Sequence, residues 1–363
     1  MKILHIISTI GKHAGDLVVA LNYIRKMKSQ DVVSEIAYIK LKDEDLVVQL
    51  EEEGILLHQI EKLNLTNFNK IKQQLEEIIK NGNYDVVHLH LCLMQKVVKS
   101  ALKKFPNIKL IAHSHLWGRD KGFLKKIRDK ILLSGITKNA DGFLACSNNA
   151  GKFMFGDFFD TKKTNCQIIY NAFDIEKFKF SDKFRKEIRQ EFAISENGFV
   201  VLHIGRFTEQ KNNDYVLDVF KEVQKLNPNA VLLCVGNGKD KEKFLERVQV
   251  EKVKNVHISE TRSDIEKLYS AADVFIFPSR FEGLGNVLIE AQANGLSCVA
   301  SDRVPPETKC SDSIKYLPID IDPKEWAKVV LESKRTNKTN MNNYDINEQF
   351  KSLINFYKQV TDK

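Results

Sequence analysis

Short apolar runs rich in β-branched residues alternate with longer amphipathic stretches along most of the chain. Such runs predict buried strands, because a strand covered on both faces reads as a continuous hydrophobic segment. The predicted strands are Ile3–Ile7, Val33–Ile39, Val86–Leu89, Leu110–His113, Gly142–Ala145, Val200–Ile204, Ala230–Val235, Val256–Ile258, Val274–Phe277 and Ser297–Ala300. Predicted helices between them include Leu17–Lys28, Ile71–Lys80, Tyr215–Leu226, Lys239–Val248, Ile265–Ser270 and Asn286–Asn294. This alternation predicts an α/β fold with parallel sheets covered by helices.

The two series of elements predict two domains, and 363 residues allow each domain its own core. Periodicity is lost over IIYNAFDIEKFKF, residues 168–180, so we expect domains at 1–172 and 173–344. The polar stretch Lys334–Tyr344 is typical of a linker, and an amphipathic helix within 345–363 then closes the chain.

Composition is that of an ordinary soluble protein, with 43% hydrophobic and 29% charged residues. No apolar run approaches the roughly 18 residues of a membrane-spanning helix. The six cysteines are scattered and predict free thiols in a reducing cytoplasm. No cysteine–histidine cluster has the ligand spacing of a zinc site, so we expect no metal of that kind.

The net charge of +8 lies in residues 1–165, which hold 26 basic and 18 acidic residues, whereas the remainder is balanced. Such an excess suits nucleic acid, an anionic membrane surface or a phosphorylated substrate, unless it is merely a solvated face. Nucleic acid is the weakest of these, since no zinc-finger, RNP-like or helix-turn-helix signature is present. The excess includes Lys121, Lys125, Lys126, Arg128 and Lys130, and the last four are candidates for one exposed helix face.

Three strand ends carry candidate chemistry, since ligands of parallel α/β sheets bind beyond the carboxyl ends of strands. In VLHIGRFTEQKN, Gly205 permits close backbone approach, and Arg206 and Lys211 are cations suited to a diphosphate. In FIFPSRFEGLGNVLIEAQANG, Glu282 lies in the loop and Glu290 in the helix that follows.

Carboxylates placed in this way accept hydrogen bonds from hydroxyl groups, although a structural glutamate pair is the simpler alternative. Gly283 and Gly285 leave amides free for a phosphate at the helix N-terminus. The third strand end is LIAHSHLW, where we expect His113 and His115 on alternate sides, so that only one faces a site.

These motifs resemble the retaining glycosyltransferases of family 4 (glycosyl transferases group 1), in particular the bacterial capsule and exopolysaccharide type. The resemblance is densest over Gly205–Lys211 and Arg262–Glu307, with weaker echoes in VVHLH, IAHSH, ACSNNAGKFMFG and YNAFDIEKF. It implies the GT-B fold: two Rossmann-like domains facing a cleft, with the C-terminal helix returning to the first.

The resemblance also implies a role for each matching residue. His113, Arg206, Lys211 and Glu282 would be catalytic: His113 and Glu282 beside the transferred sugar, and the two cations at the departing diphosphate. Donor binding would extend to Gly15, Gly205, Arg262, Gly283, Leu284, Gly285, Asn286 and Glu290, with Glu290 on the ribose hydroxyls.

The implied activity is transfer of a hexose from a nucleotide-diphosphate sugar, with a UDP-sugar favoured, to a lipid-linked saccharide. No cofactor and no metal are expected, because fixed cations replace the metal. The Asp-x-Asp strings at Asp43–Asp45 and Asp320–Asp322 resemble a metal-binding motif only weakly, and the second is expected to cap a helix at Pro323. Retention could follow double displacement or front-face attack. The expected location is the cytoplasm, peripherally at the inner face of the cell membrane.

Two departures leave alternatives open. The family's Gly-Gly-Ala-Glu loop is replaced by Ala14-Gly15-Asp16-Leu17, and Glu260 stands where a glycine is usual near the base. A catalytically degenerate GT-B subunit acting with a partner enzyme and a GT-B nucleotide-sugar epimerase therefore remain as alternatives to the transferase.

Overall fold

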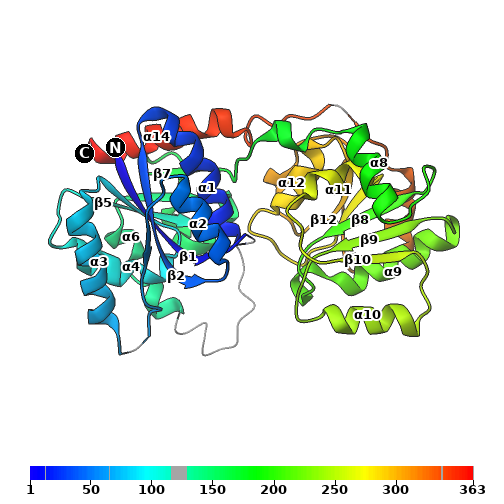
Figure 1. The fold of residues 1–363 in the computed structure, drawn as a ribbon, viewed down its shortest axis with the longest axis horizontal. Coiled ribbons are helices and arrows are strands. Elements are labelled where there is room, and N and C mark those ends of the chain that lie inside the picture. The colour runs from blue at the N-terminus through cyan, green and yellow to red at the C-terminus, as the bar shows by residue number, and fades with distance from the viewer. Residues whose placement is uncertain (13, 65, 116–128, 337, 363) are drawn as a thin grey trace. The chain divides into compact units, whose positions relative to one another are not determined.

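The computed structural model describes residues 1–12, 14–64, 66–115, 129–336 and 338–362, which form two compact units. The first unit contains Met1–Phe173 and Asn343–Lys363, and the second contains Asp174–Asn342. Each is built on one parallel sheet with helices on both faces (Figure 1). The predicted α/β class with two Rossmann-like sheets is therefore confirmed.

The sheet of the first unit has the strand order β3-β2-β1-β4-β5-β6-β7. Its strands are β1 Lys2–Ile10, β2 Val33–Leu41, β3 Leu57–Gln59, β4 Val86–Leu89, β5 Lys109–Ser114, β6 Gly142–Ala145 and β7 Cys166–Ile168. Its helices include α1 Gly15–Met27, α2 Glu44–Glu52, α3 Phe68–Gly82, α4 Gln95–Leu102, α6 Ile136–Asn139, α7 Asn148–Phe155 and α14 Ile346–Thr361.

The sheet of the second unit has the order β10-β9-β8-β11-β12-β13. Its strands are β8 Val200–Ile204, β9 Val231–Val235, β10 Val256–Ser259, β11 Val274–Phe277, β12 Ser297–Ser301 and β13 Ile314–Leu317. Its α-helices are α8 Asp182–Glu191, α9 Asn213–Leu226, α10 Lys241–Val250, α11 Ile265–Ala271, α12 Asn286–Ala293 and α13 Pro323–Glu332. Strands β3, β7 and β13 were not expected, because these edge strands span only three or four residues and lack a long apolar run.

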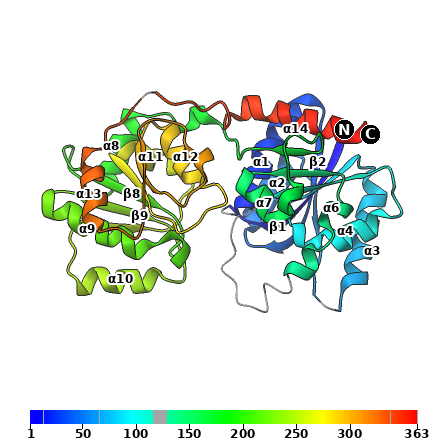
Figure 2. The same cartoon turned by 180° about the vertical axis from the view of Figure 1, so that it is seen from behind.

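The C-terminal helix α14 packs beside α1 on the sheet of the first unit (Figure 1 and Figure 2). Phe356 lies against β6 at Gly142, where a Cβ atom would come within 3.0 Å of its ring. The chain segments that leave and re-enter this unit are bonded together, since Phe173 N donates to Tyr344 O and Ile346 N donates to Phe173 O. Helix α14 is therefore an integral part of the first core.

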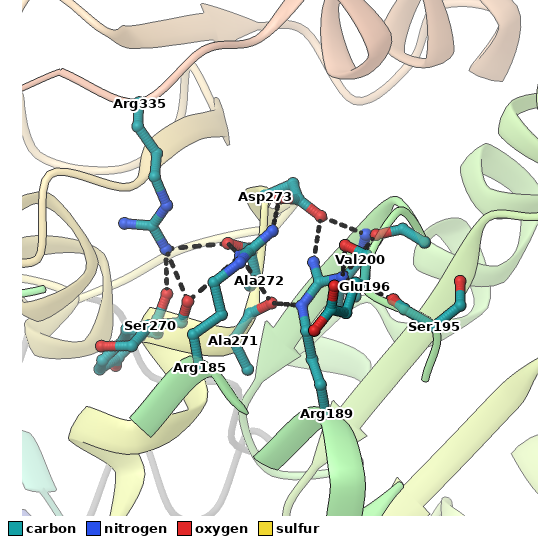
Figure 3. Close-up of polar contacts among 12 residues, drawn as sticks. Arg185, Arg189, Ser195, Glu196, Val200, Ser270, Ala271, Ala272, Asp273 and Arg335 are labelled. Atoms are coloured by element: carbon teal, nitrogen blue, oxygen red, sulfur yellow. Dashed lines mark hydrogen bonds and ion pairs between the residues drawn. The ribbon is translucent and has the colours of Figure 1, made fainter. Parts of the chain in front are cut away.

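Three arginines hold the second unit together around the carboxyl end of α11 (Figure 3). Arg185 and Arg189 each form an ion pair with Asp273 and donate to the carbonyl of Ala271, the last residue of the helix. Arg335 donates to Ala272 O at 2.8 Å and to Asn294 Oδ1 at 2.8 Å. The expectation of a simple linker at 334–344 is thus wrong in part: the described residues of this stretch are irregular, but Arg335 ties the stretch to the second unit.

Within the described ranges, no helix has the combination of length and apolar character needed to cross a bilayer. Lys121 and three residues of the predicted basic face, Lys125, Lys126 and Arg128, lie outside the described residues. Lys130 is described and exposed.

Candidate active site

The loop between β8 and α9 places the two predicted cations of the second unit. Gly205 follows the buried strand, and a Cβ atom there would lie 3.3 Å from the side chain of Lys211. The next loop comes even closer: a Cβ atom at Gly236, where φ is +148°, would lie 2.1 Å from Gly205 O. Glycine at Gly205 and Gly236 therefore lets Lys211 and two loop backbones pack together at the strand ends.

The predicted cation and carboxylate of two separate motifs form one ion pair. Lys211 Nζ lies 2.7 Å from Glu282 Oε1, and both side chains are largely buried. The ammonium also lies 4.6 Å from the ring centroid of Phe277 at the end of β11. Because the pair is shielded from solvent, its charges interact more strongly than a surface pair would.

Helix α12 begins beside this pair. Gly285 adopts φ +93° as its N-cap residue, a conformation that glycine accepts without strain. Leu284 is buried, while Gly283 and Asn286 are half-buried. The first amides of α12 therefore lie in the same loop as Glu282, and the dipole of the helix favours an anion there.

Glu290 lies one turn into α12 and is half-buried. The hydroxyl of Tyr269 donates to Glu290 Oε2 at 2.8 Å. Burial raises the pKa of Glu290 to about 7, and the bond from Tyr269 opposes that rise only in part. The carboxyl group thus titrates near neutrality, which is common at functional sites.

Arg206 and Arg262, the two arginines predicted to bind the donor, differ in their surroundings. Arg206 is exposed and forms no ion pair with any described residue, so its charge is available to a ligand. Arg262 is held by two carboxylates: its guanidinium donates to Asp264 at 2.8 Å and 2.9 Å and also pairs with Glu191. A role of Arg262 in donor binding remains a prediction. A bound donor would compete with these two carboxylates for the guanidinium.

In the first unit, Gly15 starts α1 just after β1, and a Cβ atom there would meet nothing within 4 Å. His113 lies near the carboxyl end of β5 and is 2% exposed. These residues belong to a different unit from Arg206, Lys211, Glu282 and Glu290.

The expectation that His113 and His115 point to opposite sides is wrong. Their ring centroids lie 4.0 Å apart, because residues two positions apart in an extended chain share a face. His115 is the more accessible of the two.

Sequence reasoning missed that these histidines belong to a group of five. Hydrogen-bonded contacts join His88 to His113 and join His5, His90 and His115 in a second row. The rings of His88 and His90 stack at 4.1 Å, so the two rows lie against each other. The repeated His-x-His spacing of VVHLH and IAHSH was the available signal.

Sequence spacing did not suggest that these histidines come within ligand distance of one another, and the expectation of no bound metal stays a prediction. One nitrogen from each of His5, His88 and His90 lies within 4.8 Å of the others, as does one from each of His90, His113 and His115. Neutral imidazoles are ligands for zinc and related ions. The Asp-x-Asp strings have another role: Asp43 and Asp322 cap α2 and α13, the latter as expected.

Comparison with known proteins agrees with this architecture. Residues 184–341 match the family described as Glycosyl transferases group 1, and residues 31–177 match Glycosyltransferase Family 4. The Staphylococcus aureus capsular polysaccharide biosynthesis glycosyltransferase CapH is 27% identical, with 99% of each chain covered. The crystal structure of Anabaena HepE in complex with UDP and glucose aligns with a TM-score of 0.80 at 16% identity, over 98% of each chain.

A further relative covers part of the chain. An Escherichia coli UDP-Gal:alpha-D-GlcNAc-diphosphoundecaprenol alpha-1,3-galactosyltransferase is 26% identical over 63% of this chain and 60% of its own. The two family matches together extend over most of both units, and the sheets agree with the HepE fold. The chain therefore has the GT-B glycosyltransferase fold of the group 1 and family 4 type, with one family model matching part of each unit.

Proposed function

We propose that this chain is a retaining, metal-independent glycosyltransferase that moves a hexose from a UDP-sugar to a lipid-linked saccharide in cell-surface polysaccharide synthesis. The observation that carries the proposal is the buried pair of Lys211 and Glu282 beside the N-terminus of α12. A fixed ammonium, a carboxylate and helix amides are the groups that a sugar diphosphate needs.

Each group has a distinct part in this proposal. Arg206, which has no ion-pair partner among the described residues, binds the diphosphate together with the α12 amides. Lys211 stabilises the negative charge that develops on the leaving diphosphate, and its preset position avoids reorganisation during the reaction. Glu282 accepts hydrogen bonds from the sugar hydroxyls, and Glu290 accepts them from the ribose.

The proposed substrates draw support from relatives. HepE has been crystallised with UDP and glucose, and the E. coli relative is named for UDP-Gal and a diphosphoundecaprenol-linked acceptor. Retention by front-face attack rests on the family resemblance. The basic first half of the chain suits a peripheral position at the cytoplasmic face of the membrane, where each lysine or arginine near anionic lipid contributes about 1 kcal/mol.

The first experiment is a thermal-stability titration with UDP, GDP, ADP and their hexose conjugates. A ligand at 100 times its Kd adds roughly 2.7 kcal/mol to stability, so binding produces a clear shift. We expect the shift with UDP, and its loss in Arg206→Ala and Glu290→Ala, whereas Lys225→Ala on the surface of α9 keeps it. A response to GDP or ADP alone would disprove the choice of UDP.

A transfer assay with polyprenyl-diphosphate saccharides then separates the remaining alternatives. Transfer that persists in EDTA, with the anomeric configuration kept, supports the proposal. Release of free sugar and UDP without transfer indicates the epimerase type. Absence of any nucleotide response indicates the degenerate subunit, whose partner would then have to be found.

A further inference from the structure

Burial determines how the hydroxyl group of Tyr357 on α14 forms its hydrogen bond. Tyr357 is fully buried, and its hydroxyl oxygen lies 2.6 Å from His88 Nδ1, its hydrogen-bond partner among the described residues. Burial raises the pKa of Tyr357 well above its usual value, so the phenol keeps its proton. A buried O–H must donate, and it donates to His88 Nδ1.

This bond determines where the single hydrogen of His88 lies. Burial lowers the pKa of both His88 and His113 well below the usual value, so each imidazole is neutral and carries one N–H. Since Nδ1 of His88 accepts from Tyr357, its hydrogen is on Nε2. That atom lies 3.1 Å from His113 Nδ1, so His88 donates to His113 there, and the two ring planes are within 12° of parallel.

The row of hydrogen bonds sets the tautomer of the next ring as well. His113 Nδ1 accepts from His88, so the hydrogen of His113 is on Nε2. That nitrogen is buried and has no hydrogen-bond partner in the described part of the chain. The second row differs, because both of its end atoms, His5 Nε2 and His115 Nδ1, lack partners and nothing sets its direction.

We infer that Tyr357 is a positioning residue that acts through His88 to fix His113 as the tautomer with its hydrogen on Nε2, a donor to an oxygen of the bound sugar. The inference deepens the proposed function and rests on it, and the place of His113 beside the sugar is what the family resemblance implies. It gives the C-terminal helix a part in the chemistry although Tyr357 lies 269 residues from His88 along the chain.

The direct test is the tautomer of His113 in the full-length protein, read by nitrogen NMR with ¹⁵N-labelled histidine and assigned with a His113→Gln variant. We expect hydrogen on Nε2 in the native protein and a mixed population in Tyr357→Phe. The matched control is Tyr23→Phe, which removes another buried tyrosine hydroxyl, bonded to Tyr170 O, without touching a histidine. Hydrogen on Nδ1 in the native protein, or no change in Tyr357→Phe, overturns the inference.

A second pair of variants covers the case in which Tyr357→Phe does not fold. Glutamine at position 88 can accept from Tyr357 with its oxygen and donate to His113 with its nitrogen, so His88→Gln should retain the tautomer. His88→Leu removes both bonds and should lose it. Equal tautomer populations in these two variants contradict the relay.

Activity gives an independent readout. Tyr357→Phe should lower kcat about five- to tenfold, the factor that one typical hydrogen bond supplies, and leave the donor KM nearly unchanged. Tyr23→Phe should leave both unchanged. If the tautomer is as described but no glycosyl transfer is found, the proposed function fails and the relay stands. If transfer occurs with the other tautomer, the relay fails alone.

Discussion

Lys211 Nζ and Glu282 Oε1 lie 2.7 Å apart, which joins the loop after β8 to the loop after β11. Each residue is therefore a ligand contact in the proposed function and also a structural partner of the other. A buried charge that loses its partner destabilises a protein far more than a surface charge does. Substitution of either residue alone mixes these two effects, so they have to be separated by pairs of variants.

We expect Lys211→Met to abolish transfer and to lower the free energy of unfolding by about 3 kcal/mol, because Glu282 is left buried and unpaired. Lys211→Met/Glu282→Gln should recover most of that stability, since no lone charge remains, but it should stay inactive. Urea unfolding and a transfer assay measure the two effects. The surface variant Lys225→Met, which breaks an exposed pair with Glu222, is the control and should change neither. A double variant as unstable as Lys211→Met would show that the pair itself is not the cause.

Arg206 provides the contrasting case. Its side chain is exposed and has no ion-pair partner among described residues, so Arg206→Ala should leave the unfolding free energy within about 0.5 kcal/mol. The same substitution should weaken UDP binding by roughly tenfold or more, since a charged hydrogen bond to phosphate is lost. Calorimetric titration with UDP measures this effect. Unchanged affinity would remove Arg206 from the donor site.

The raised pKa of Glu290 should make the stability of the protein depend on pH. Burial raises its pKa from 4.5 to about 7, so the folded protein binds more protons than the unfolded chain between those values. The free energy of unfolding contributed by this group is therefore fully present below pH 4.5 and falls as the pH rises through 7. The fall is at most about 3 kcal/mol, because the side chain keeps some contact with water.

Glu290→Gln should remove this slope and be the more stable protein at pH 8, since glutamine can still accept from Tyr269. Urea unfolding at pH 5, 6, 7 and 8 tests the prediction. Glu242→Gln, at an exposed position of α10, should keep the slope of the unsubstituted protein. Parallel slopes in all three proteins would mean that Glu290 does not titrate in this range.

The central strands could be predicted from sequence because burial on both faces leaves them uniformly apolar, as in Val200–Ile204 and Val274–Phe277. The edge strands Leu57–Gln59 and Cys166–Ile168 could not, since they are short and partly polar. Helix α13 was recognisable from Asp322 and Pro323, a local cap that needs no tertiary information. Sequence thus reveals elements that carry a long apolar run or a local cap, and misses short edge strands that have neither.

The site was predictable to a similar degree. Gly205, Lys211 and Glu282 stand at strand ends that the alternating pattern locates. The pairing of Lys211 with Glu282 spans 71 residues, and only the strand order β8-β11 brings the two loops together. The histidine rows likewise need β4 next to β5, and the contact with Tyr357 needs α14 to return to the first unit.

Arg335 allows a test of whether the segment after α13 is a linker or part of the second unit. Arg335→Met should lower the free energy of unfolding by roughly 3 kcal/mol, because several buried carbonyls lose a charged donor. Lys334→Met, at the exposed neighbouring position, should have little effect. If the two variants unfold alike, the bonds of Arg335 contribute nothing to the stability of this unit.

Gly238 and Gly15 differ in whether the space around them requires a residue without a side chain. A Cβ atom at Gly238 would lie 2.2 Å from Phe207 O and 2.6 Å from Phe207 N, atoms of backbone that cannot turn aside. Gly238→Ala should therefore displace the loop that carries Gly205 and Arg206, and weaken UDP binding at least about tenfold. Gly15→Ala should cost nothing in stability, because open space surrounds that position and alanine favours the helix that begins there. Calorimetry and thermal unfolding of both variants test this contrast. Loss of transfer in Gly15→Ala with unchanged folding and UDP affinity would then have one explanation: at Gly15 the acceptor or the sugar, and not the fold, requires a residue without a side chain.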